Sequence, residues 1–361
     1  MDTTIRAQEA IPARIDRLPV SREIWGIMLL AGVAWLVESY DVGVIGSVLP
    51  SLQREFHLGA FSVGLLAIAS TTSTGCGRPA PTLPGSSSNE EVFSGRLTRT
   101  YLLHVPSGYQ AHSGEALVLN FHGHGSNAMQ QEHRSGMSLL ADQQGFIAVY
   151  PQGVVGPDGR TGWDTGARGR PQVNDVLFVS DLLNHLQSIL CIDPLRIYAT
   201  GFSNGGGMTN VLACTLAGHL AAFAPVSGSY PPYPGGCHPV RPVPLLEFHG
   251  TADRVVPYNS SKSRQYPPIL AWLQGWAARD GCTTGPTVFY SQGNVTGLEW
   301  THCRGNAAVV HFRMQGEGHT WPSARFNVSF NVSGGTTGTT KALSASALIW
   351  SFFQQHPLMS Q

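Results

Sequence analysis

Short apolar runs alternate with segments of helical periodicity from residue 99 to the end of the chain, and this alternation constrains the fold more than any other feature. The apolar runs predict strands at residues 99–106, 116–121, 146–150, 196–200, 222–226, 245–248 and 309–314. The periodic segments predict helices at residues 175–190, 208–216, 269–279 and 343–355. Strands separated by helices pair in parallel, so we expect an α/β fold with a mostly parallel sheet and helices on both of its faces.

The charge balance excludes several classes of function. The 361 residues contain 22 Lys and Arg against 22 Asp and Glu, so the formal net charge is zero. A nucleic-acid-binding protein needs a basic surplus, which this chain lacks, and we expect no nucleic-acid partner. Six cysteines, an even number in a turn-rich chain, indicate disulfides and an oxidising compartment. Four N-x-S/T sequons, at Asn259, Asn294, Asn327 and Asn331, agree with a secreted glycoprotein.

Residues 1–70 differ from the rest of the chain and read as a hydrophobic leader. The apolar stretch 24–37 is shorter than the ~20 residues that span a bilayer. The longer stretch 24–49 is interrupted by Glu38 and Asp41, which are costly inside a membrane. Residues 35–52 resemble the first membrane helix of a major-facilitator transporter, but no later segment supplies the remaining helices.

Two main interpretations of this leader remain open. As a signal anchor, residues 24–49 would contact the membrane, and the four arginines ahead of them would stay inside, leaving the bulk of the chain outside. As a secretory signal, residues 63–69 would end at the A-x-A cleavage site Ala67–Ala69. A third, a lipoprotein signal ending at Cys76, lacks the usual leucine three residues earlier. We therefore expect a secreted protein, or alternatively a membrane-anchored one with its folded domain outside.

A domain boundary follows the leader. Residues 71–90 are rich in Pro, Gly, Ser and Thr, and this composition predicts a linker. Residues 91–361 then remain for one folded domain with a single core.

The segment Gly201–Gly205 matches G-x-S-x-G, directly after a predicted strand and before a predicted helix. A serine on a sharp strand-to-helix turn is the setting of a nucleophile elbow, in which glycines on both sides let the turn pack tightly. A serine hydroxyl is a poor nucleophile unless a base is positioned beside it. The pattern therefore predicts Ser203 as a nucleophile, with its base and acid further along the chain.

The candidate acid and base follow the serine in the order Ser, Asp, His. Asp253 lies just past the end of the predicted strand 245–248. His319 lies in a glycine loop after the strand 309–314 and is followed by the rigid Trp321–Pro322 pair. His249, His302 and His311 fit less well, because they lie within or beside strands.

Acyl transfer also needs hydrogen-bond donors for the oxyanion. We expect one to be the backbone N–H of Asn204, the residue after the nucleophile. The other is expected at the turn His122–Gly125, with the backbone N–H of His124 as the candidate. The H-x-H pattern in this turn also fits a metal site, but no third ligand has a suitable spacing, so we expect no metal.

The residues assembled above belong to longer runs that resemble the secreted feruloyl esterases and polyhydroxybutyrate-depolymerase-like esterases of carbohydrate esterase family 1. The matching runs are residues 75–77, 191–208, 221–230, 244–258, 272–282 and 316–322. The resemblance implies an α/β-hydrolase fold, a triad of Ser203, Asp253 and His319, and hydrolysis of carboxylic esters without a cofactor. Two departures are the turn sequence H-G-H-G and the transporter-like leader.

The expected substrate is a small or polysaccharide-linked ester, most closely a feruloyl ester of the plant cell wall. Polyhydroxybutyrate and acetylated xylan are the alternatives within the class, and a non-catalytic membrane-anchored binding protein is the alternative outside it. Aromatic side chains near the motifs are candidates for holding a phenolic ring, namely Trp163, Tyr230 and Trp321.

The disulfide pairing is only partly predicted. Cys282 and Cys303 flank a predicted strand pair before the His319 loop, and we expect them to be bonded. The other four, Cys76, Cys191, Cys214 and Cys237, would form two more bridges, and their pairing stays open.

Overall fold

The computed structural model describes residues 75–166, 173–260, 265–322 and 343–359. The chain divides into two units, Met1–Thr72 and Ser73–Gln361, and every described residue belongs to the second. The predicted leader, including residues 24–49, lies outside the described residues, so its anchor and signal interpretations stay predictions. Among the described residues, no helix is long and apolar enough to cross a membrane.

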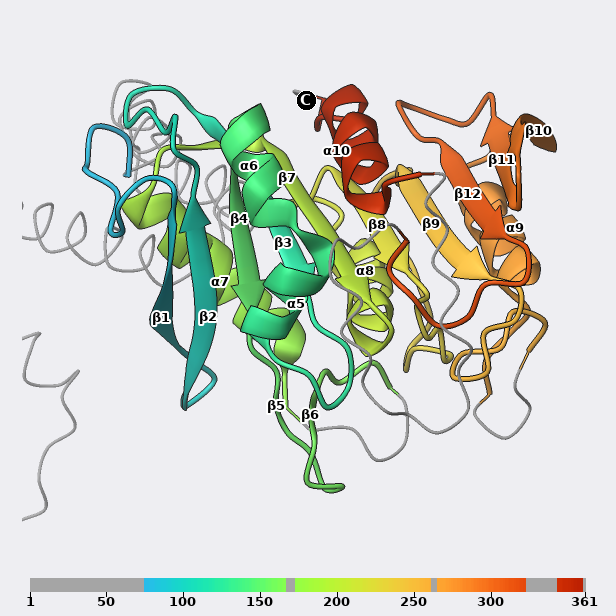
Figure 1. Ribbon diagram of the computed structural model, residues 1–361, viewed down its shortest axis with the longest axis horizontal. Helices are drawn as coiled ribbons and strands as arrows, with labels where there is room; N and C mark the ends of the chain where they lie inside the picture. Colours follow the sequence, from blue (N-terminus) through green and yellow to red (C-terminus); the bar gives the residue numbers. More distant parts are fainter. Residues whose placement is uncertain (1–74, 167–172, 261–264, 323–342, 360–361) are drawn as a thin grey trace, which may run out of the picture. The chain divides into compact units, whose positions relative to one another are not determined.

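A ten-stranded sheet forms the centre of the second unit (Figure 1). Its six middle strands, from β4 to β12, run parallel, and an antiparallel strand pair closes each edge. In spatial order the strands are β1 (Ser86–Ser94), β2 (Leu97–Val105), β4 (Phe146–Pro151), β3 (Glu115–Phe121), β7 (Ile192–Phe202), β8 (Ala222–Val226), β9 (Leu245–Gly250), β12 (Val309–Met314), β11 (Val295–Thr301) and β10 (Thr284–Gln292). A small hairpin pairs β5 (Val154–Val155) with β6 (Thr161–Gly162).

Helices cover both faces of this sheet (Figure 1). One face carries α5 (Ala128–Ser135), α6 (Met137–Gln144) and α10 (Ala345–Gln355), and the other carries α7 (Asp175–Ile189), α8 (Asn204–Thr215) and α9 (Ile269–Arg279). Two clusters of buried apolar side chains fill the two layers between helices and sheet. The predicted mostly parallel α/β architecture is therefore confirmed, and it is consistent with an α/β-hydrolase fold.

The edges of the sheet are where the sequence predictions need correction. The predicted linker 71–90 is wrong at its end, because β1 begins at Ser86 and pairs with β2 along its whole length. This edge strand alternates between partly buried and exposed residues and is built largely from Ser, Asn and Glu, so it carries no apolar run. Helices α5 and α6 were not predicted either, since each is only eight residues long.

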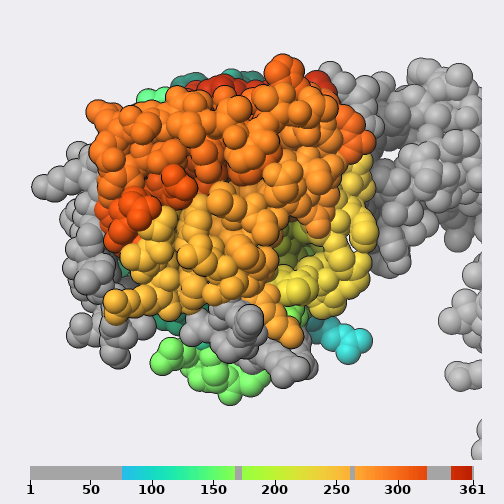
Figure 2. All heavy atoms as spheres, turned by 90° about the vertical axis from the view of Figure 1, so that its right-hand side faces the viewer, coloured from blue at the N-terminus to red at the C-terminus, as the bar shows by residue number. Residues whose placement is uncertain are grey.

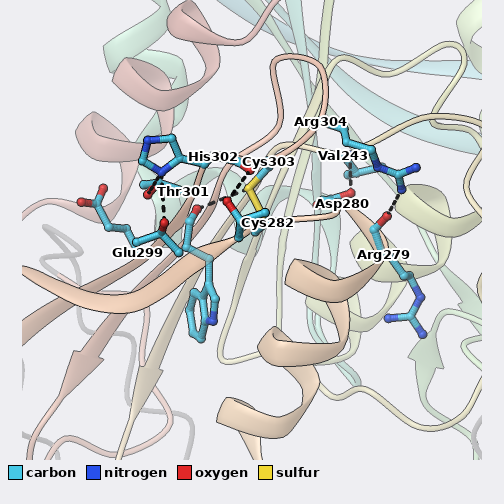
Figure 3. The surroundings of a disulfide bond; sticks show 12 residues. Val243, Arg279, Asp280, Cys282, Glu299, Thr301, His302, Cys303 and Arg304 are labelled. Atoms are coloured by element: carbon cyan, nitrogen blue, oxygen red, sulfur yellow. Dashed lines mark hydrogen bonds between the residues drawn. A yellow bond between two sulfur atoms is a disulfide. The ribbon is translucent and has the colours of Figure 1, made fainter.

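Three disulfides join the six cysteines: Cys76 to Cys191, Cys214 to Cys237, and Cys282 to Cys303. The predicted Cys282–Cys303 bond is confirmed, and it ties the end of α9 to the end of β11 (Figure 3). Figure 2 shows this end of the sheet, where residues of α9 through β12 form most of the face. Because the sulfur of Cys76 is in a disulfide, the lipoprotein interpretation has no thiol to modify.

Candidate active site

Ser203 lies at the turn between strand β7 and helix α8, as the G-x-S-x-G pattern predicts. Its backbone has φ 57° and ψ −115°, a conformation that is strained for a residue with a side chain. The backbone N–H of Ser203 donates to the carbonyl of Val226 on β8, 3.0 Å away, which fixes the turn against the sheet. Its side chain makes no capping hydrogen bond to α8, although it occupies the N-cap position.

Two glycines allow this turn to form. A Cβ on Gly201 would lie 2.4 Å from the carbonyl oxygen of Gly205 and 2.9 Å from Cβ of Phe121. A Cβ on Gly205 would lie 2.1 Å from the carbonyl oxygen of Phe121 and 2.6 Å from that of His122. Only glycine fits at both positions, because the elbow packs directly against the end of β3. Helix α8 begins directly after the elbow, at Asn204, four residues before the predicted start.

Asp253 and His319 follow the carboxyl ends of the neighbouring parallel strands β9 and β12, which lie at the same edge of the sheet. The distance from Asp253 Oδ2 to His319 Nδ1 is 2.7 Å, and the Asp253 side chain is fully buried. The other carboxylate oxygen accepts the backbone N–H groups of Val255 and Val256, each at 2.8 Å. Burial raises the pKa of Asp253, but hydrogen bonds from His249 and His319 outweigh it and hold the pKa well below its ordinary value. Asp253 is therefore an anion that faces a histidine ring.

The His319 ring lies next to the residue that precedes Ser203. The ring centroids of His319 and Phe202 are 4.7 Å apart. Thr320, the residue after His319, is also held in place. The hydroxyl of Ser227, just past β8, donates to its carbonyl at 3.1 Å. These contacts place the ring of the predicted base beside Phe202, one residue before the predicted nucleophile.

The predicted oxyanion turn runs directly alongside the elbow. A Cβ on Gly123 would come within 3.4 Å of Cβ of Ser203. The Asn204 side chain accepts the backbone N–H of Trp163 at 2.8 Å, so it joins the elbow to the segment after β6. The turn thus lies against Ser203, and the assignment of the His124 and Asn204 N–H groups as oxyanion donors stays a prediction.

The two histidines of this turn have separate environments. His122 is buried, with Nδ1 2.8 Å from the carbonyl of Gly123, and its Nε2 accepts the N–H of Gly153 at 2.9 Å. Burial lowers the pKa of His122 to about 4, so it is neutral. His124 Nε2 instead lies 2.7 Å from Asp158 Oδ2, at the tip of the β5–β6 hairpin. Among the described residues, no group of three or more His, Cys, Asp or Glu side chains is arranged to hold a metal.

The predicted substrate-binding aromatics are core residues in this structure. Trp163 has no exposed surface, and Trp321 and Tyr230 are 2% and 3% exposed. Trp163 packs on Phe121 and donates its indole N–H to the carbonyl of His122. Trp321 donates to Ser346, and Tyr230 stacks on Trp272 with its hydroxyl directed to Glu247. A ring enclosed on all sides cannot stack on a ligand, so this expectation is corrected.

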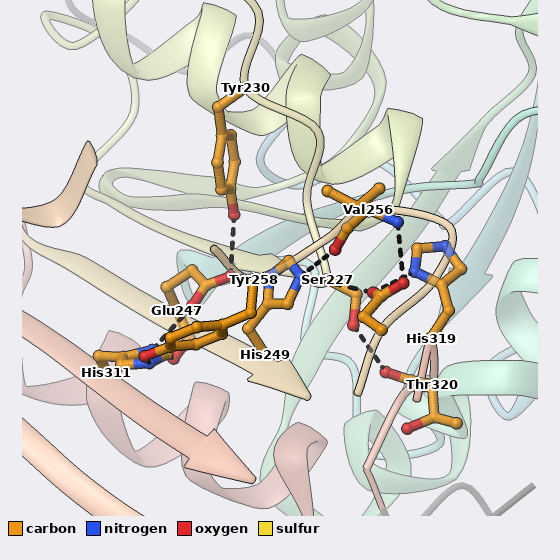
Figure 4. Close-up of polar contacts among 10 residues, drawn as sticks. Ser227, Tyr230, Glu247, His249, Val256, Tyr258, His311, His319 and Thr320 are labelled. Atoms are coloured by element: carbon orange, nitrogen blue, oxygen red, sulfur yellow. Dashed lines mark hydrogen bonds and ion pairs between the residues drawn. The ribbon is translucent and has the colours of Figure 1, made fainter. Parts of the chain in front are cut away.

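A buried polar cluster behind Asp253 was not predicted. Glu247 and His249 alternate along β9 and therefore face the same side of the sheet. His249 Nδ1 lies 2.9 Å from Glu247 Oε1, and His249 Nε2 lies 3.4 Å from Asp253 Oδ2 (Figure 4). Charged residues at every second position of a wholly buried strand were the available signal, since an unpaired buried charge is rare.

Comparisons with known proteins agree with this geometry. The family model described as Esterase PHB depolymerase matches residues 99–231. Feruloyl esterase B of Piromyces equi is 34% identical over 237 residues, covering 61% of this chain and 42% of that protein. The putative esterase NocK of Nocardia uniformis subsp. tsuyamanensis is 30% identical over 278 residues, covering 70% of this chain and 78% of NocK.

Two further relatives have names that include a substrate. The probable feruloyl esterase C of Aspergillus clavatus is 30% identical over 217 residues, covering 59% of this chain and 73% of that protein. Among solved structures, an acetyl xylan esterase from Aspergillus awamori has a TM-score of 0.50 at 19% identity, covering 64% of this chain and 94% of that one. The second likeness shows the fold alone. This chain spans less than half of the Piromyces protein and more than two thirds of NocK.

Proposed function

Because this chain belongs to the esterase family that contains the feruloyl esterases and matches the Esterase PHB depolymerase model, we propose that it hydrolyses carboxylic esters through a serine nucleophile. The resemblance seen in its motifs is confirmed by these relatives. The observation that carries the proposal is the buried Asp253 carboxylate, 2.7 Å from Nδ1 of His319, beside the strained elbow of Ser203. Because an anion at Nδ1 holds the ring proton on that nitrogen, the lone pair of Nε2 is free to act as a base.

In the proposed reaction, the hydroxyl of Ser203 attacks the ester carbonyl and transfers its proton to Nε2 of His319. Asp253 holds the imidazole in the required tautomer and stabilises the imidazolium that forms. The backbone N–H groups of Asn204 and His124 donate to the oxyanion of the tetrahedral intermediate. The alcohol leaves with the proton from His319, and an acyl-serine remains. Water activated by His319 then releases the acid.

The substrate that we propose is a feruloyl or related hydroxycinnamoyl ester attached to plant cell-wall polysaccharide. Two of the relatives named above are feruloyl esterases by name, and this supports the choice. Acetylated xylan and polyhydroxybutyrate are the competing substrates within the class. We further propose a secreted protein, supported by three disulfides, which persist in oxidising compartments.

The test of the substrate class is a panel of three esters: methyl ferulate, acetylated xylan and short hydroxybutyrate oligomers. We expect ferulate release to have the highest kcat/KM, with loss of all activity in Ser203→Ala. The control is Ser188→Ala on α7, whose hydroxyl donates only to a carbonyl of its own helix. Activity confined to the polyester or to acetylated xylan would overturn the feruloyl assignment but leave the assignment as an esterase intact.

A further inference from the structure

A cluster of buried ionisable side chains contacts Asp253 through His249, and the proposed mechanism does not use it. Figure 4 shows this cluster. Glu247 and His249 come from β9, His311 comes from β12, and Tyr230 and Tyr258 come from the segments after β8 and β9. Glu247, His249 and His311 have side chains with no exposed surface. Burying ionised groups is costly unless they are paired, so this arrangement needs a physical reason.

Hydrogen-bond geometry fixes one of the protons of His249. Its Nε2 is 2.8 Å from the carbonyl oxygen of Val256, and because a carbonyl only accepts, this nitrogen carries a proton. Its Nδ1 is 2.9 Å from Oε1 of Glu247. Both ring nitrogens therefore face an oxygen acceptor. An imidazolium has an N–H donor on each nitrogen and so satisfies both acceptors.

The groups around Glu247 favour its ionised form. The hydroxyl of Tyr230 donates to Oε1 at 3.2 Å, and Nδ1 of His311 lies 2.8 Å from Oε2. The hydroxyl of Tyr258 lies 2.9 Å from the other nitrogen of His311, so it can supply the proton there. Burial opposes ionisation, but the facing histidines lower the pKa of Glu247. Burial alone would lower the pKa of His249. The negative charge of Glu247 outweighs burial and raises the pKa of His249 to about 10.

The His249 ring touches the acid loop at two points. It lies against the carbonyl of Val256 and, at 3.4 Å, against Oδ2 of Asp253, the same oxygen that faces His319. We propose that Glu247 and the doubly protonated His249 are positioning residues that hold the Asp253 carboxylate in place and in its ionised form. This inference rests on the proposed serine-esterase function, because it acts through Asp253.

The charge of His249 has a consequence for the pH dependence. Protonating His319 creates a positive charge beside Asp253, and the nearby positive charge of His249 opposes it. The groups that face His249 are Glu247, Asp253 and the Tyr258 ring, with His311 and Tyr230 reaching it through Glu247. Removing only the positive charge therefore moves the acid limb of the kcat/KM profile to higher pH.

The experiment compares His249→Gln and Glu247→Gln with His104→Gln in the full chain. His104 is a matched control, because it is 3% exposed and lies 3.2 Å from a carboxylate oxygen of Asp142, in a pair that does not contact the triad. We expect His249→Gln to lower kcat about tenfold with KM within about twofold, and to move the acid limb upward. Glu247→Gln removes the anion that keeps His249 an imidazolium, so His249 becomes neutral and the limb should move in the same direction. His104→Gln should not move it. Rates are normalised to the concentration of active sites, which is measured from the initial burst of product released by an ester substrate.

Nitrogen-15 NMR of histidine-labelled protein supplies a readout that needs no activity. We expect two nitrogen-bound protons on one imidazole at pH 7, with both signals absent in His249→Gln. A single protonated nitrogen on His249 overturns the inference, as does a normalised kcat and pH profile of His249→Gln equal to those of the wild type. If the wild-type protein hydrolyses no ester, the proposed function fails by itself, and the NMR result still decides the charge state of His249.

Discussion

Adding one methyl group at the elbow tests whether its geometry sets the rate. In Gly205→Ala, the new Cβ would lie 2.1 Å from the carbonyl oxygen of Phe121, 2.5 Å from its carbon and 2.6 Å from the carbonyl oxygen of His122. All three atoms are backbone, so no side chain can rotate away. Either the end of β3, which leads into the proposed oxyanion turn, or the start of α8 must move.

The size of that movement gives the expected effect. Restoring a normal contact needs a displacement of about 1 Å, and a 1 Å misplacement near the reacting groups costs on the order of 100-fold in rate. This corresponds to about 2.7 kcal/mol of transition-state stabilisation. Overpacking of this kind lowers the free energy of unfolding by about 1–3 kcal/mol, which a domain of this size tolerates.

The assay measures kcat/KM for a 4-nitrophenyl ester. Each value is divided by the fraction of folded protein, which urea unfolding curves give. Gly108→Ala is the matched control, because its Cβ would meet no atom within 4 Å, and it should keep wild-type activity. A folded Gly205→Ala variant with kcat/KM within threefold of wild type would refute the reasoning, since the elbow would then tolerate displacement.

The remaining predictions concern stability and its pH dependence. Removing Cys76–Cys191, which spans 115 residues, should lower the free energy of unfolding by about 5 kcal/mol, against about 3 kcal/mol for Cys282–Cys303, which spans 21. Urea titrations of the two double-alanine variants check this, and equal losses would contradict it. Arg99→Met leaves the Asp175 carboxylate, 2.8 Å from Arg99 in the wild type, buried without its cation and should cost about 3–5 kcal/mol. Adding Asp175→Asn should recover part of that loss in a double-mutant cycle. Because the pKa of Asp253 is depressed in the folded state, this group adds stability above its unfolded pKa of about 3.9, and that stability is lost as the pH falls below this value. Asp253→Asn should therefore flatten the decline of Tm between pH 5 and pH 2, and an unchanged slope would count against the buried pair.

What could be predicted from the sequence was mostly local. The elbow at Ser203 follows from glycine spacing and from the strand and helix on either side of it. Asp253 and His319 each follow the end of a predicted strand, and the carboxyl ends of parallel strands share one edge of the sheet. That arrangement brings the two side chains together without further information.

What could not be predicted depends on long-range packing. Proximity of Trp163 to the motifs along the chain suggested a binding role, but exposure is decided by residues such as Phe121 and Phe178, which come from other elements. The pairing of Cys76 with Cys191 closes a long loop that no local pattern reveals. Strand β1 was missed because an edge strand can be polar on both faces.

The most direct test of the account is mass spectrometry of the protein after treatment with a fluorophosphonate, which phosphonylates activated serines. We predict one adduct per chain, on the peptide that contains Ser203, and none in Ser203→Ala under the same conditions. Folded wild-type protein that takes up no label, or label on a different serine, would contradict the assignment of Ser203 as the nucleophile.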